Sequence, residues 1–291
     1  MKTFLFAASS LLALAVSAQP RKVSQAYMTT TLNIIAPESE DVQNLQSSQE
    51  PGRGGMNWRN MMDGETKINT YIKGDLVKNI MKSDMGKTTS YRDNKEKRTT
   101  MVMEMMGNKM GFSTTDEEME AMQKRRDSMM AERRKADSTN GQRREMFMDR
   151  NNMPTELVKT TETKKIAGYN CTKAFLVTQR LLGGADTAVV WYTPEFKIDN
   201  FSSLGSMASN MPGPARNMMP SLNGLDKIEG FALRYEMKMR GNRRAEVEVN
   251  KIELDKNIDD KEFNIPSDIE IKPMREMRNM FGGGRGGEMR F

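Results

Sequence analysis

The sequence predicts a mainly β protein in which short antiparallel strands are interrupted by one charged helix. Apolar and polar residues alternate in short runs from position 65 onward, as they do in half-buried strands. Turn residues such as Gly74-Asp75 and Gly241-Asn242 separate these runs, and their close spacing favours an antiparallel meander over βαβ units. The alternation is lost between positions 114 and 150, where capping residues open a helical pattern.

The N-terminus has the layout of a secretory signal peptide. Lys2 precedes an apolar run over 4–16, and Val16-Ser17-Ala18 is a small-residue cleavage site. The run is too short to span a bilayer, and no cysteine follows the cleavage site to carry a lipid anchor. We therefore assign residues 1–18 to a signal peptide and expect a periplasmic or secreted protein with no lipid anchor and no transmembrane segment.

Composition excludes several classes of function. The sequence contains no histidine, which removes the commonest general base and metal ligand. Its single cysteine, Cys171, cannot form an intramolecular disulfide, and we expect it to be buried and inert. The formal charge of +6 does not indicate nucleic-acid binding. Because no nucleophile elbow or phosphate-binding loop is present, we assign no catalytic, cofactor or metal residues and expect no enzyme.

One β-rich domain is expected over 19–272. It carries a loop insertion at 37–60, which has Pro and Gly but no periodicity. A second long loop, 201–225, is rich in Pro and Met, and loops of this length are often lids or binding loops. The glycine-rich end, 273–291, is expected to be a disordered tail.

The strands can be placed from their alternation and from the turns between them. In the last long strand the apolar positions shift by one between Val249 and Ile252, which indicates a β-bulge. A segment at 263–271 then closes the domain. The ranges expected to form strands are 22–35, 66–73, 76–82, 87–92, 97–106, 109–113, 160–167, 169–178, 187–193, 230–240 and 243–254.

The charged insertion at 114–150 is expected to begin with a surface helix from about Asp116 to Lys135. Thr114-x-x-Glu117 and Thr115-x-x-Glu118 both match the capping box. Acidic residues crowd the first turn and basic residues the last, as the helix dipole favours. Its methionines form only a narrow apolar stripe, so the helix should lie at the periphery. Its basic clusters are either a solvated face or a contact for anionic lipid or polyanions.

Methionine is the unusual component, with 29 copies. Met101, Met103 and Met105 alternate with Val102 and Glu104, so a strand would project the three thioethers from one face and Glu104 from the other. Methionine fills irregular cores and adaptable apolar surfaces, and it can also ligate Cu(I). The pattern therefore leaves three interpretations open: a packed core face, an apolar groove or a soft-metal site.

Two segments resemble a signature of uncharacterised secreted envelope proteins, in which an IxGYxCxKA hairpin precedes a WYTPEI-like strand: KKIAGYNCTKA at 164–174 and VWYTPEF at 190–196. The family named for a GLPGLI motif shares this signature with a related family of unknown function. The segments at 71–77 and 263–266 are similar to it as well. These families are similar, more distantly, to periplasmic lipoprotein carriers whose half-barrel holds acyl chains beneath helical lids. The resemblance, over residues 63–271, implies a curved antiparallel sheet or half-barrel with helix and loop lids.

The resulting hypothesis is a non-enzymatic exported envelope protein. Its concave apolar face would bind a lipid, a lipoprotein acyl chain or another apolar ligand. Two alternatives remain: a methionine-rich protein that handles Cu(I), and a structural or partner-binding module, with an envelope protein as partner, whose concavity is filled by side chains. Met211-Pro212-Gly213-Pro214 stands where the GLPGLI motif would lie.

We predict that the exported protein begins at Gln19, because cleavage after a small-residue site removes the whole apolar run. N-terminal sequencing of the protein from the periplasmic or secreted fraction checks this. An exported protein that retains Met1 would contradict it.

Overall fold

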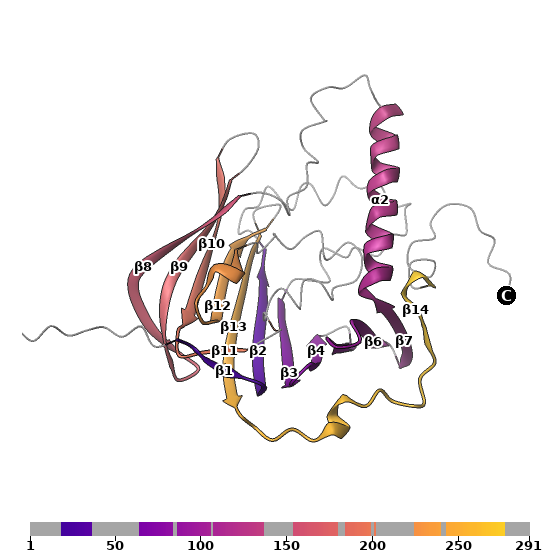
Figure 1. Ribbon diagram of the computed structural model, residues 1–291, viewed down its shortest axis with the longest axis horizontal. Helices are drawn as coiled ribbons and strands as arrows, with labels where there is room; N and C mark the ends of the chain where they lie inside the picture. The colour runs from indigo at the N-terminus through magenta and orange to yellow at the C-terminus, as the bar shows by residue number, and fades with distance from the viewer. Residues whose placement is uncertain are drawn as a thin grey trace, which may run out of the picture.

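The structure, a computed structural model, describes residues 19–36, 64–83, 86–105, 107–136, 154–179, 184–198, 201, 224–239 and 243–276. Its main feature is a 12-stranded sheet that curves around an inner face (Figure 1). The sheet stays open between its edge strands, β14 (Ile271–Pro273) and β8 (Thr155–Ile166). The predicted curved, mainly antiparallel sheet is therefore confirmed, as an open sheet.

The strand order is β14-β7-β6-β5-β4-β3-β2-β13-β12-β10-β9-β8, so two meanders meet where β2 pairs with β13. Short turns make the sequential neighbours antiparallel. The other strands are β2 (Gln25–Ile35), β3 (Gly64–Lys73), β4 (Leu76–Ser83), β5 (Gly86–Asp93), β6 (Arg98–Met105), β7 (Asn108–Thr115), β9 (Tyr169–Gln179), β10 (Ala185–Thr193), β12 (Phe231–Lys238) and β13 (Arg244–Leu254).

The predicted hairpins at Gly74-Asp75 and at Gly168 form between β3 and β4 and between β8 and β9, whereas the predicted turn residues Gly241 and Asn242 lie outside the described residues. Between β8 and β9, Ala167 and Gly168 have φ angles of 48° and 89°, the left-handed pair that a tight two-residue turn requires. In β13 the register with β2 shifts between Val249 and Lys251. The predicted bulge is therefore confirmed, and it keeps the apolar positions of β13 on one face.

Two parts of the chain differ from the expectation. The predicted strand at 22–35 is divided at Ser24 into β1 (Arg21–Val23) and β2, and β1 pairs in parallel with β11 (Phe196–Ile198). The segment at 263–271 forms a 3-10 turn, η6 (Asp260–Phe263), and then extended chain before β14, which pairs in parallel with β7. Parallel pairing requires a long connection, and here the chain after β13, an interior strand, crosses beneath the sheet to the edge at β7 (Figure 1).

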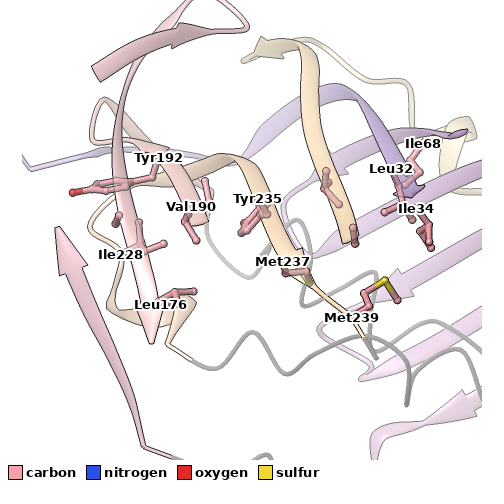
Figure 2. Packing of buried hydrophobic residues seen from close by; sticks show 14 residues of the cluster. Leu32, Ile34, Ile68, Leu176, Val190, Tyr192, Ile228, Tyr235, Met237 and Met239 are labelled. Atoms are coloured by element: carbon pink, nitrogen blue, oxygen red, sulfur yellow. The ribbon is translucent and has the colours of Figure 1, made fainter. Parts of the chain in front are cut away.

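Strand pairing gives the sheet two chemically distinct faces. The described residues bury two apolar clusters, of which the Tyr235 cluster lies on the inner face and is shown in Figure 2. The Tyr235 cluster lies on β2, β3, β9, β10, β12 and β13 and includes Ile228, next to η5 (Leu225–Lys227). The Phe231 cluster also includes Val23, Phe196 and Ile198 of β1 and β11, so the small sheet packs against the large one. Burying these side chains is the main source of stability for a single-layer sheet.

On the outer face, the C-terminal segment lies across β3 to β7. Lys73 donates to Asp260 at 2.6 Å, and Lys78 donates to Glu262 at 2.9 Å. Nearer β14, the segment packs on Gly111, where an added Cβ would lie 2.3 Å from the Ile271 side chain. Any larger residue at position 111 would therefore require the Ile271 side chain to move.

Helix α2 (Asp116–Ala136) follows β7 directly and stands away from the sheet (Figure 1). Its N-terminus has the predicted Thr115 capping box: the Glu118 amide donates to Thr115 Oγ1 at 3.2 Å, and the Thr115 amide donates to Glu118 Oε2 at 3.1 Å. Arg92 of β5 donates to both carboxylate oxygens of Asp116, at 2.6 and 2.9 Å. Farther along, Met129 is 51% exposed, so the predicted peripheral position of the helix is confirmed.

We predict that replacing residues 117–150 by a short glycine linker preserves cooperative unfolding and changes the free energy of unfolding by less than about 1 kcal/mol, because the helix buries little apolar area. Asp116→Ala in the full chain should cost about 1 kcal/mol, since a partly exposed, bidentate charge pair is lost. Urea titration measures both. Loss of cooperativity on deletion would mean that the helix belongs to the core.

The contribution of Asp116 should depend on pH. Its hydrogen bonds from Arg92 lower the pKa of the carboxyl below its ordinary value of 3.8. A depressed carboxyl pKa stabilises the folded state above the ordinary value, and this stabilisation is lost as the pH falls through the folded pKa. The difference in stability between the wild type and Asp116→Ala should therefore be full at pH 6 and should shrink below about pH 4.

Candidate functional site

The predicted methionine face lies on the inner side of the sheet, on β6. Met101 and Met103 are 3% and 4% exposed. Strand pairing places Met101 opposite Phe112 and Met103 opposite Met110, and alternation along β6 places Met105 on the same face. We refer to Met101, Met103, Met105, Met110 and Phe112 as the methionine patch.

Glu104 lies on the outer face, as its position between Met103 and Met105 predicts. Its carboxylate accepts a hydrogen bond from Lys87 of β5 at 2.9 Å. The carboxylate is therefore occupied by a lysine and separated by the sheet from the thioethers. It cannot contribute a ligand or a charge to the methionine patch.

The methionine patch is separate from the two apolar clusters. Neither the Tyr235 cluster nor the Phe231 cluster includes Met101, Met103 or Phe112, although each of these three side chains is at most 4% exposed. Among the described residues, β6 and β7 thus carry buried apolar side chains on the inner face that belong to neither cluster. The methionine patch is the strongest candidate for a site that binds an apolar group.

A row of neutral polar side chains lies between the methionine patch and β2. Thr70, Asn79 and Ser90 occupy adjacent register positions on β3, β4 and β5, and they are 3%, 7% and 6% exposed. Thr70 Oγ1 donates to Asn79 Oδ1 at 2.8 Å, and Asn79 Nδ2 donates to Ser90 Oγ at 3.5 Å. We call these three residues the polar row; Ser90 lies opposite Met101, and Thr70 lies opposite Met28.

Sequence reasoning missed the polar row because threonine, asparagine and serine on a strand resemble a solvated face. A signal was nevertheless present. Val77, Asn79 and Met81 alternate on β4, so an apolar side chain precedes and follows Asn79 on one face. An amide with apolar neighbours on both sides along the same strand face predicts a buried polar group.

The described residues include no cluster of three or more Cys, His, Asp or Glu side chains that could hold a metal ion. Soft-metal binding would therefore depend on thioethers, of which Met103 and Met110 lie directly opposite each other. The other methionines that the sequence analysis singled out, Met207, Met211, Met218 and Met219, lie outside the described residues. The loop insertion at 37–60 and the tail from position 277 also lie outside them.

Cys171 on β9 is fully buried, as predicted. Its Sγ lies 3.7 Å from the carbonyl oxygen of Tyr169, to which the thiol donates a weak hydrogen bond. Burial disfavours the thiolate and raises the pKa of Cys171 from 9.0 to about 11. A buried thiol with a raised pKa is the opposite of an activated nucleophile.

The charged side chains of the outer face are largely paired. Arg234 of β12 donates to Glu236 and to Glu248, each at 2.6 Å. The ammonium groups of Lys164 and Lys173 lie 4.3 and 5.8 Å from the ring centroid of Trp191, and desolvation lowers the pKa of Lys164. This arrangement is typical of a structural outer face, on which lysines cover an aromatic side chain.

The fold and the inner face define the class: an open, curved antiparallel sheet with apolar side chains and a neutral polar row on its inner side. The chain belongs to the family described as "Domain of unknown function (DUF4412)", whose model matches residues 53–269. No curated protein matches the sequence. No helix in the described part of the chain is long and apolar enough to cross a membrane.

Among solved structures, the chain is similar to two crystal structures of PNGF-II, in the P21 and C2 space groups. Sequence identity is 17% in both cases, with TM-scores of 0.36 and 0.35. The match covers 90% of this chain but only 34% and 33% of those chains. The chain therefore spans about a third of the length of the PNGF-II structures.

We predict that Cys171 reacts slowly with an aromatic disulfide reagent in the folded protein. The rise in pKa from 9.0 to about 11 reduces the thiolate fraction at pH 8 about 100-fold, and burial blocks access as well. Absorbance at pH 8, with and without urea, gives the two rates, and Cys171→Ser serves as the blank. Fast labelling of the native protein, or a disulfide-linked dimer on a non-reducing gel, would contradict the prediction.

Proposed function

We propose that this protein is a non-enzymatic exported protein of the bacterial cell envelope that binds a lipid or another apolar ligand on the inner face of its curved sheet. The observation that carries the proposal is the methionine patch. Met101, Met103 and Phe112 are withdrawn from water, yet they belong to neither of the two apolar clusters. An apolar surface within a concave fold is the usual setting for an apolar ligand.

The chemistry of methionine suits a ligand of variable shape. A thioether side chain is unbranched, flexible and polarizable, so a surface of several methionines can adjust to different acyl chains. Met103 lies opposite Met110 across β6 and β7, with Met105 near the end of β6. Lipid tails, which vary in length and unsaturation, are therefore a better fit to this surface than a rigid ligand.

The remaining parts of the proposal rest on the sequence. The signal-peptide layout of residues 1–18 supports export, and the absence of histidine from the sequence supports a binding protein over an enzyme. The more distant resemblance to periplasmic lipoprotein carriers supports an acyl ligand. Fold and family do not themselves assign a function, so the ligand has to be measured.

One observation favours a second candidate, the handling of Cu(I). Met103 and Met110 are directly opposite each other, and thioethers are soft ligands for Cu(I). We prefer a lipid as the ligand because strand alternation places Glu104 and every other charged side chain of β6 on the face opposite these thioethers. No charged group of β6 can therefore join the thioethers in a metal site. Dialysis of the protein against Cu(I) distinguishes the two functions, with a variant in which Met101, Met103 and Met105 are replaced by leucine as the control.

We predict that lipid co-purifies with the protein and that Met103→Trp reduces the amount bound at least severalfold, because the larger ring occupies the space that an acyl chain would fill. The cost in stability should stay below about 1 kcal/mol if the patch can adapt. Native mass spectrometry and lipid extraction measure the load. Met129→Trp is the matched control, since Met129 lies on the exposed side of α2 and its replacement should change neither quantity.

Other results would favour the alternatives. A loss of about 1–3 kcal/mol in Met103→Trp, with no lipid in either protein, would identify a packed core and hence a structural or partner-binding module. Cu(I) binding that disappears in the triple leucine variant, without a change in stability, would identify a metal-handling protein. Each result overturns the proposal of a lipid ligand.

A further inference from the structure

The polar row ends in hydrogen-bond donors that have no acceptor in the described part of the chain. Ser90 Oγ accepts from Asn79 Nδ2, which leaves the Ser90 hydroxyl proton to donate elsewhere. The Asn79 amide carries two protons and uses one of them for Ser90. Both side chains are more than nine-tenths buried, so within the described ranges the row leaves two buried donor protons without an acceptor.

Whatever group occupies the inner face has to supply hydrogen-bond acceptors if these donors are to be satisfied. A buried donor without an acceptor costs about 1–3 kcal/mol, and an acceptor on a ligand would remove that cost. The row runs in one direction, from the Thr70 hydroxyl through Asn79 to Ser90. Its open end faces Met101 on the adjacent strand, which places the donors beside the methionine patch.

The row also indicates the charge of the missing acceptor. Thr70, Asn79 and Ser90 are neutral, and their register neighbours Met28 and Met101 are apolar. A carboxylate or phosphate would lose its hydration here without gaining an opposite charge, which is costly. The nearest cation along β5, Arg92, is held by two hydrogen bonds to Asp116. A neutral acceptor, such as the carbonyl oxygen of an ester, satisfies the donors without that cost.

We propose that the polar row recognises the ester carbonyl oxygens of a diacyl glycerolipid, with Ser90 Oγ and Asn79 Nδ2 as the donors. This inference rests on the proposed function, because it assigns a role within the same lipid-binding face. Two open donors match the two ester carbonyls that lie together where the acyl chains of such a lipid meet. Beyond Ser90 lie the apolar side chains of Met101 and Phe112, so acyl chains attached to the bound carbonyls can extend over the methionine patch.

The test compares two lipids that differ only at the proposed contact. The mature protein is incubated with vesicles that contain equal amounts of ester-linked dioleoyl phosphatidylcholine and ether-linked dioleyl phosphatidylcholine, and the lipid bound to the re-isolated protein is quantified by mass spectrometry. The head group is the same and the chains match apart from the carbonyls. One hydrogen bond contributes about 0.5–1.5 kcal/mol, so we expect the wild type to prefer the ester lipid roughly threefold to tenfold.

Variants of the row should remove this preference while retaining total binding. Ser90→Ala deletes the hydroxyl donor, and Asn79→Leu deletes the amide at similar volume. The matched controls are Ser113→Ala and Asn69→Leu, since these residues lie on the outer face at partly exposed positions of β7 and β3. Both controls should keep the ester preference of the wild type. Thermal unfolding of all four variants identifies any that fail to fold, and Ser90→Ala is the mildest change.

The outcomes separate this inference from the proposed function. A wild type that extracts both lipids equally would overturn carbonyl recognition and leave lipid binding intact. A wild type that extracts neither lipid would overturn both. An ester preference that persists in Ser90→Ala and in Asn79→Leu would show that other groups read the carbonyls, and the assignment of the polar row would be wrong.

Discussion

The pairing of β2 with β13 is the interaction on which the inner face depends. It joins two meanders that are distant in sequence, and it places Leu32 opposite Val247 and Ile34 opposite Ala245. Because side chains alternate with a period of two, a slip of one residue here would turn one half of the apolar face outward. The bulge between Val249 and Lys251 adds one residue to β13, so the apolar side chains on both sides of the bulge stay on the same face. The continuity of the inner apolar face therefore depends on a local irregularity.

The C-terminal segment explains why β5 and β6 are buried on both faces. Thr89 and Val102, at 4% and 2% exposure, lie on the outer side, next to the strands that carry Lys78 and Gly111 and hold this segment. An antiparallel sheet commonly leaves one face exposed to water. Here the irregular C-terminal segment covers part of that outer face and is held there by ion pairs and by its contact with Gly111. The outer side of the methionine strands is thus covered, and the ligand that we propose would bind on their inner side, which carries the methionine patch.

The local elements were predictable, and the long-range ones were not. Turn residues and alternation placed the hairpins, the bulge and the capping box of α2, since each depends on neighbours within about a dozen residues. The parallel pairs β1–β11 and β14–β7 carry no such signal, because their partners are set by how the chain crosses the sheet. The same limit applies to the site. The methionine face was visible on one strand, whereas the polar row takes one residue from each of three strands and exists only once the register is known.

The polar row bears on whether the inner face is a core or, as we propose, a binding face. In a core, replacing both partners of a buried hydrogen bond by apolar groups of the same shape is often neutral or stabilising, since it removes the cost of desolvation. Thr70 and Asn79 satisfy each other at 2.8 Å, but the contact from Asn79 to Ser90 is 3.5 Å long, at the limit for a hydrogen bond. The weak end of the row is the end beside the methionine patch. Folding alone gains little from donors held in this way, whereas a ligand that brings a neutral acceptor gains both a hydrogen bond and a defined position on an otherwise featureless apolar surface.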